Sequence, residues 1–151
     1  MPDINFSVVG YSQSATRMAV KARDFTMIVD EPPVLGGQDK GPNPVEYLLS
    51  AVVGCLNVTG YIVAGEMGLT INSLEITANG DINPDLLFGK VTNDRAGYKG
   101  ISIDFCIDAQ ADQETLDSWL SQVKARCPVS DNLANLTPVS IALNVLEPQA
   151  I

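Results

Sequence analysis

One long helical segment in the middle of the chain constrains its fold more than any other feature. Asn43 is expected to cap this helix, Pro44 to occupy its first position, and Glu46 its third, where the carboxylate can reach back to the amide of the cap. The helix is expected to run to about Met67 and to end at Gly68 in a left-handed conformation. Because apolar residues lie nearly all round it, this helix must be buried.

Three glycines interrupt the apolar surface of this helix, at Gly54, Gly60 and Gly65. Each costs about 1 kcal/mol relative to alanine in a helix interior. Another element, such as a second helix, is therefore expected to pack closely against the glycines.

The remaining segments indicate an α+β domain that spans residues 1–151. Alternating or β-branched runs predict strands at residues 4–9, 16–22, 25–30, 69–78, 101–108 and 138–146, and the first three are expected to form an antiparallel meander. An amphipathic helix is predicted at residues 112–126. Residues 31–42 are rich in proline and glycine and read as a loop, and residues 82–100 are expected to hold a short strand and a loop.

Composition narrows the class of protein. Hydrophobic residues make up 46% of the chain and charged residues only 18%, which favours a folded domain with part of its surface covered by a second subunit. The net charge is −9 and the basic residues form no run, so nucleic-acid binding is not expected. The N-terminus has no signal core and no apolar run is recognised as long enough to span a membrane, so a cytoplasmic protein is expected.

The chain contains three cysteines and no histidine. Nucleophile pairs of the Ser/His or Cys/His kind are therefore excluded, as is any metal site built on histidine. An odd number of cysteines in a reducing compartment argues against a structural disulfide framework. Sulfur is the first candidate for chemistry in this protein.

The three cysteines occupy different settings. Cys127 precedes Pro128, which suits the first position of a short helix, so Cys127 is expected to be its N-cap, where unpaired amides favour a thiolate. Cys55 lies in the apolar middle of the long helix, and a cation would have to reach it from elsewhere in the fold. Cys55 could instead be a buried small hydrophobe, and Cys127 could be a helix terminus that happens to contain cysteine. That interpretation is preferred for Cys106, on the polar face of its predicted strand.

The sequence resembles the OsmC/Ohr family of osmotically inducible and organic-hydroperoxide-resistance proteins over nearly its whole length. The resemblance is carried by Gly36-Gly37, by Gly-Pro-Asn-Pro-Val-Glu-Tyr-Leu-Leu at residues 41–49, by Gly54-Cys55, and by Cys127-Pro128-Val129.

This resemblance implies an intertwined α+β homodimer, with an antiparallel sheet, a long buried central helix and two active sites at the subunit interface. It implies that Cys55 attacks an organic or lipid hydroperoxide and becomes a sulfenic acid, and that Cys127 resolves it as a disulfide. An external dithiol, such as a lipoyl-bearing protein, would then reduce the disulfide. No bound cofactor or metal is implied.

The family resemblance leaves the group that activates Cys55 open. Ohr-type members use a glutamate directly after Asn-Pro, where this chain has Val45. Glu46 follows, but nine helical steps turn it roughly 180° from Cys55, so it serves either catalysis or capping alone. Arg17 lies in the early strand region where the family places its activating arginine, and Arg23 is the alternative.

The sequence also leaves open the roles of the arginines and the function itself. Either Arg17 or Arg23 could equally be a solvated strand residue. Arg95 could approach the subunit interface, although no physical argument connects it to sulfur. Val45 also motivates a rival function, in which a non-catalytic dimer of this family binds a small hydrophobic ligand.

Overall fold

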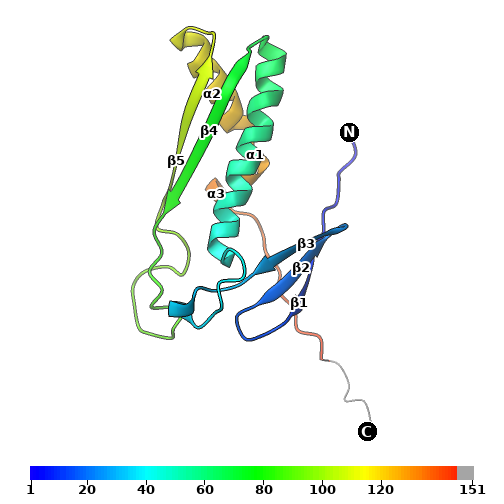
Figure 1. Ribbon diagram of the computed structural model, residues 1–151, viewed down its shortest axis with the longest axis vertical. Helices are drawn as coiled ribbons and strands as arrows, with labels where there is room; N and C mark the ends of the chain where they lie inside the picture. Colours follow the sequence, from blue (N-terminus) through cyan, green and yellow to red (C-terminus); the bar gives the residue numbers. More distant parts are fainter. Residues whose placement is uncertain (146–151) are drawn as a thin grey trace.

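Helix α1 (Pro44–Met67) is the spine of the computed structural model, which describes residues 1–145 (Figure 1). Both expected ends are confirmed. The Asn43 side chain accepts the amide of Glu46 at 2.9 Å, and the Glu46 carboxylate accepts the amide of Asn43 at 2.8 Å. At the other end Gly68 adopts a φ of 67° and donates its amide to Ala64. The helix therefore begins and ends at residues that satisfy its free backbone groups.

One face of α1 packs against α2 (Gln113–Arg126) and against the antiparallel pair β4 (Ile71–Gly80) and β5 (Ile101–Ala109) (Figure 1). Trp119 of α2 lies at the centre of this core. Its indole donates to the carbonyl of Gly60 at 2.9 Å, and its ring meets Phe105 edge to face at 5.8 Å. A Cβ on Gly60 would lie 3.0 Å from that ring. The close packing expected at the glycines is thus confirmed at Gly60.

The opposite face of α1 is exposed in the single chain. Val58, Tyr61 and Ile62 are exposed by 58%, 48% and 51%. A Cβ added to Gly54 or Gly65 would meet nothing within 4 Å. The composition of this helix predicts that it is completely buried. One chain does not achieve this burial, because the core elements cover only one of its two apolar faces.

The expectation about membrane-spanning length was wrong for α1. Within residues 1–145, α1 is the one helix long and apolar enough to cross a membrane by length and composition, and 33% of its most apolar window is buried. The core helix of a soluble protein passes the same test. Polar residues and glycines interrupt the apolar residues of α1, so the sequence shows no continuous apolar run of spanning length.

The N-terminal strands form a separate antiparallel sheet beside the start of α1 (Figure 1). They are β1 (Val9–Ser12), β2 (Met18–Ala22) and β3 (Phe25–Val29), in the order β1-β2-β3, so the expected meander is confirmed.

The first strand was expected at residues 4–9 but begins only at Val9. Val9 pairs with Lys21, and β2 ends one residue later at the turn through Arg23, whose φ is 55°. Earlier residues therefore have no partner in β2, and Ile4 and Phe6 are exposed.

Two further strand predictions were wrong. Residues 82–100 form a loop without a strand, and residues 138–145 form no strand, while residue 146 lies outside the described residues. Apolar residues nevertheless alternate in this sequence, and Val139, Ile141, Leu143 and Val145 are exposed by 80% to 93%. A strand needs a neighbour to satisfy its amides and carbonyls, and the described chain offers none here.

The other predictions agree closely with the structure. Strands β4 and β5 correspond to the segments predicted at 69–78 and 101–108. Helix α2 begins after Asp112, its N-cap, and a short helix α3 (Pro128–Ala134) follows Cys127. Ile103, Phe105 and Ile107 of β5 face the core, as the alternation predicts.

The loop between β3 and α1 is organised by one buried carboxylate. Asp30, 1% exposed, accepts the amides of Glu31, Gln38 and Lys40 at 2.9 to 3.2 Å. Burial alone would raise the pKa of Asp30, but these amides and the hydroxyl of Thr16 outweigh it and hold the pKa below its ordinary value. The proline- and glycine-rich loop, which contains the short 3-10 helix η1 (Pro33–Leu35), is thereby tied to the sheet.

Asp30→Asn should lower the free energy of unfolding at pH 7, because the amide side chain lacks the charge that these donors stabilise. A carboxyl whose pKa is lowered by folding stabilises the fold above its unfolded pKa, about 4, and this contribution is lost as the pH falls through the folded pKa. The stability difference from wild type, measured by urea unfolding, should therefore shrink in acid. Asp24→Asn is the control, and equal stability of wild type and Asp30→Asn at pH 7 would contradict this account.

Candidate functional site

Cys55 and Cys127 come together at the inner face of α1. Cys127 lies between α2 and α3 and is 1% exposed, and partly buried Cys55 packs against the same core. The side chain of Cys55 is close enough to that of Cys127 to change its pKa by a hydrogen bond and by charge. Both are free thiols. Two residues far apart in sequence thus form one thiol pair.

Cys127 is the N-cap of α3, as expected, but its acidity is the reverse of the expectation. The amide of Ser130 donates to the Cys127 sulfur at 3.4 Å. Burial raises the pKa of Cys127, the Ser130 amide lowers it, and Cys55 raises it again, so that the pKa lies above its ordinary value. The prediction of an acidic thiol was wrong because it weighed the cap without the cost of burying a charge.

Glu46 is engaged in the capping box of α1, where its carboxylate accepts the amide of Asn43 at 2.8 Å. This contact agrees with the capping role, and the catalytic role remains a prediction. Val45 lines a cavity next to this helix turn instead of presenting a carboxylate to it.

Arg17 and Arg23, which flank the two ends of β2, do not meet the thiols within their own chain. Arg17 donates to Gln38 at 3.2 Å, and its Nε is buried without a hydrogen-bond partner among the described residues. Arg23 lies over the ring of Phe25 at 5.1 Å. No hydrogen bond within residues 1–145 joins either guanidinium to Cys55. The activating role of Arg17 therefore stays a prediction.

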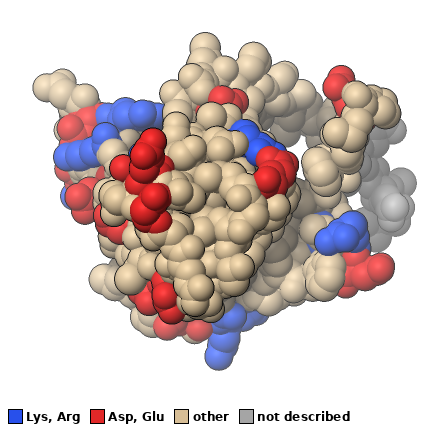
Figure 2. All heavy atoms as spheres, turned by 90° about the horizontal axis from the view of Figure 1, so that it is seen from above, with Lys and Arg blue, Asp and Glu red and all other residues tan. Residues whose placement is uncertain are grey.

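The surface carries more acidic than basic side chains, and three of the basic ones within residues 1–145 form ion pairs. On the face shown in Figure 2, basic side chains lie beside acidic ones and no continuous basic patch is present. Ion pairs join Lys90 to Asp85 and Lys99 to Asp94 at 3.0 and 2.8 Å, and Arg126 to Glu66. No cluster of three or more metal-ligating side chains occurs in residues 1–145.

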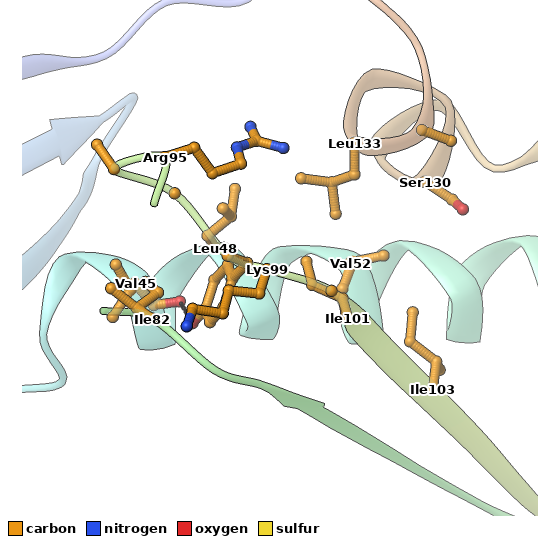
Figure 3. Close-up of a pocket in the computed structure, with 15 residues that line it drawn as sticks. Val45, Leu48, Val52, Ile82, Arg95, Lys99, Ile101, Ile103, Ser130 and Leu133 are labelled. Carbon is orange, nitrogen blue, oxygen red and sulfur yellow. Dashed lines mark hydrogen bonds between the residues drawn. The ribbon is translucent and has the colours of Figure 1, made fainter. Parts of the chain in front are cut away.

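A cavity of about 430 Å³ lies along the first half of α1 (Figure 3); neither Cys55 nor Cys127 lines it, but each adjoins a residue that does. Its floor is the α1 stripe of Val45, Leu48 and Val52, and Cys55 is the next residue on that stripe. Ser130, whose amide contacts the Cys127 sulfur, lines the cavity on α3. The remaining lining residues are Ile82, Arg95, Ala96, Gly97, Tyr98, Lys99, Gly100, Ile101, Ile103, Leu133 and Ala134.

The loop at residues 82–100 supplies one wall of this cavity and is anchored at several points. The Tyr98 hydroxyl donates to the carbonyl of Val45 at 2.9 Å. Burial raises the pKa of Tyr98, and the charge of Glu46 raises it further, so Tyr98 remains a donor. Asn83 donates to Asp94 at 2.8 Å. The sequence offered no signal for this wall, because its contacts with α1 join residues distant in the chain.

Two free thiols beside an apolar cavity can carry out reversible sulfur redox chemistry. A thiolate can attack an electrophile held in the cavity, and the neighbouring thiol can then form a disulfide with it. The volume lies within the range of about 300 to 1,000 Å³ typical of small-molecule sites.

Comparison with protein families matches residues 37–142 to the OsmC-like protein family. Among solved structures, an OsmC-like protein from Mycoplasma pneumoniae is similar at 20% identity and a TM-score of 0.77, covering 89% of this chain and 91% of that one.

Two structures described as organic hydroperoxide resistance proteins are also similar. The one from Legionella pneumophila has 16% identity and a TM-score of 0.65, covering 87% of this chain and 91% of that one. The one from Elizabethkingia anophelis has 16% identity and a TM-score of 0.63, with 87% and 89% covered. At such identities the likeness establishes the fold. A search of curated protein sequences gave no significant match.

The raised pKa of Cys127 is open to a direct test. In Cys55→Ala/Cys106→Ala, thiolate absorbance should give a midpoint above that of an exposed cysteine, about 8.5, because burial disfavours the thiolate. Restoring Cys55 should move the last titration step higher, since the two thiols titrate as a pair. The same variants unfolded in urea are the control. A folded-state midpoint at or below the unfolded one would contradict the assignment.

Proposed function

The chain belongs to the OsmC-like protein family, and on that premise we propose that it is a thiol-dependent peroxidase that reduces organic or lipid hydroperoxides. The observation that carries the proposal is the pair of free thiols, Cys55 and Cys127, beside an apolar cavity. Similar structures described as organic hydroperoxide resistance proteins support the same reaction class.

The proposed reaction uses the two sulfurs in sequence. The Cys55 thiolate attacks the terminal peroxide oxygen, so that an S–O bond forms, the O–O bond breaks, and the alcohol leaves after taking up a proton. The Cys127 thiol then attacks the sulfenic sulfur, an S–S bond forms, and water leaves. The raised pKa of Cys127 supports this order, because a protonated thiol is a poor first attacker.

An external dithiol, such as a lipoyl-bearing protein, completes the proposed cycle by reducing the disulfide through thiol exchange. The dithiol supplies the two electrons that reduced the peroxide to alcohol and water, and it leaves as a disulfide. A reducing cytoplasm is the compartment that suits free thiols of this kind.

The proposed working form is an intertwined homodimer. Two apolar surfaces of this chain lack cover within the described residues: the α1 face that bears Val58, Tyr61 and Ile62, and the alternating segment at residues 138–145. A second copy would cover the first with its own α1, close to Gly54 and Gly65, and would give the second a strand to pair with. A twofold arrangement does both at once.

Arg17 of the second subunit is the proposed activating group for Cys55. Its sheet lies away from the core in Figure 1, and its buried Nε has no hydrogen-bond partner among the described residues. A guanidinium brought to the thiol by the other subunit would stabilise the thiolate.

The rival function is a non-catalytic dimer that binds a small hydrophobic ligand. The apolar cavity and Val45, in place of a carboxylate, favour it. It predicts that hydroperoxide is not turned over at all, whichever cysteines are present.

Replacement of the attacking sulfur should abolish activity. Cys55→Ser is expected to remove turnover of cumene hydroperoxide with dithiothreitol, measured by loss of peroxide, because serine cannot form the sulfenic acid. Cys106→Ser is the matched control, since Cys106 is an exposed thiol on β5. Full turnover by Cys55→Ser, or equal loss in both variants, would contradict the assignment.

Subunit mixing tests the dimer and Arg17 together. Arg17→Gln alone should slow turnover about a hundredfold, the usual scale for loss of one charge-stabilising group. Co-expression with Cys55→Ser should restore activity to about a quarter of the wild-type sites, because random pairing rebuilds one complete site in each mixed dimer.

Light scattering on the wild type should give twice the chain mass of 16.1 kDa. An inactive mixture would show that Arg17 acts within its own chain, and full turnover by Arg17→Gln alone would show that Arg17 does not activate the thiol.

A further inference from the structure

Arg95 stands apart from the other residues that line the cavity. Most of the lining is apolar or backbone, and it includes two cations, Arg95 and Lys99. Lys99 is neutralised by Asp94 at 2.8 Å, which also raises the pKa of Lys99. Arg95 makes no ion pair or hydrogen bond within residues 1–145. The cavity therefore contains one positive group whose charge is available to a ligand.

Arg95 lines the cavity, and its side chain is exposed to solvent. Figure 3 shows its side chain extending above Leu48 of α1 toward Leu133 of α3, with Ser130 beyond Leu133. The backbone that carries it is fixed on one side, because neighbouring Asp94 is held by Asn83 and Lys99. Arg95 is thus presented over an apolar floor from an anchored loop.

Arg95 lies at a distance from sulfur. The groups that shift the pKa of Cys127 are its burial, the amides of Ser130 and Val129, and Cys55, with no guanidinium among them. Leu48 and Cys55 are two helical turns apart, roughly 10 Å along the axis of α1. Arg95 is therefore better placed to hold one end of a ligand than to activate a thiol at the other end.

We propose that Arg95 binds the carboxylate of an aliphatic acid whose chain lies over Leu48 and Val52 and whose far end reaches the thiol pair. A guanidinium offers two parallel donors that match a carboxylate. One unpaired cation suits a monoanion better than a phosphoryl group, whose higher charge needs more than one positive partner. The cavity combines an apolar floor with one cation, so it suits an acid that has an aliphatic chain better than it suits a small ion.

This inference deepens the proposed function and rests on it for the reaction at sulfur: the favoured hydroperoxides are those that also carry an acid group. Arg95 is then a specificity residue that sets substrate orientation. The carboxylate site itself does not depend on peroxidase activity, so binding can be measured separately.

Calorimetric titration with sodium octanoate, and with octanamide as its neutral analogue, tests the site. Wild type should bind octanoate about five- to tenfold more tightly than octanamide at low ionic strength, and salt should reduce this preference. Arg95→Gln should remove the preference and leave octanamide binding unchanged. Lys124→Gln, which makes the same charge change on exposed α2, should behave as wild type.

Two results would overturn the proposal: octanoate that binds no more tightly than octanamide to wild type, or Arg95→Gln that retains the full preference. Both are measured without peroxide, so they are independent of the Cys55→Ser experiment. Loss of the octanoate preference in Lys124→Gln as well would show a general effect of net charge, and would also count against Arg95.

Discussion

The structure depends on one constraint, which is that α1 is apolar on two opposite faces while its own chain covers only one. The core around Trp119 covers the first face, and the carbonyl of Gly60 accepts a hydrogen bond from the indole of Trp119. The second face, with Val58 and Tyr61, remains exposed. At about 25 cal/mol per Å² of apolar surface removed from water, burying such a face is a substantial driving force for association. The proposed dimer follows from this imbalance. It would also give the unpaired alternating segment at residues 138–145 a strand to pair with.

The same helix also organises the candidate site. Its capping box and the Tyr98 contact hold its first turn, from which a stripe of apolar residues leads to Cys55. Cys127 reaches that point because α2 ends there and α3 begins. The thiol pair therefore lies where the best-packed part of the molecule meets an apolar cavity. Cys55 is partly buried there, and no hydrogen bond within residues 1–145 joins it to a guanidinium, so the proposed activating arginine comes from outside this core.

Local signals predicted the parts of this fold that depend on local physics. Both ends of α1 and the cap at Cys127 were read correctly, because capping involves residues three or four apart. The first strand begins later than its sequence pattern predicts, because its start depends on where its partner strand turns. The acidity of Cys127 was wrong because burial is set by tertiary packing. The sequence alone indicates no role for Arg95, since only long-range contacts bring its loop to α1.

The central claim is that Cys55 and Cys127 act as one redox pair, and one measurement tests it most directly. Reduced protein is mixed without oxygen with one equivalent of an organic hydroperoxide, and the products are analysed by peptide mass mapping and alcohol quantification. The account predicts one alcohol per site and a Cys55 to Cys127 linkage with the loss of two hydrogen atoms. Peroxide consumption with both thiols intact, or with oxidation confined to Cys106, would contradict it.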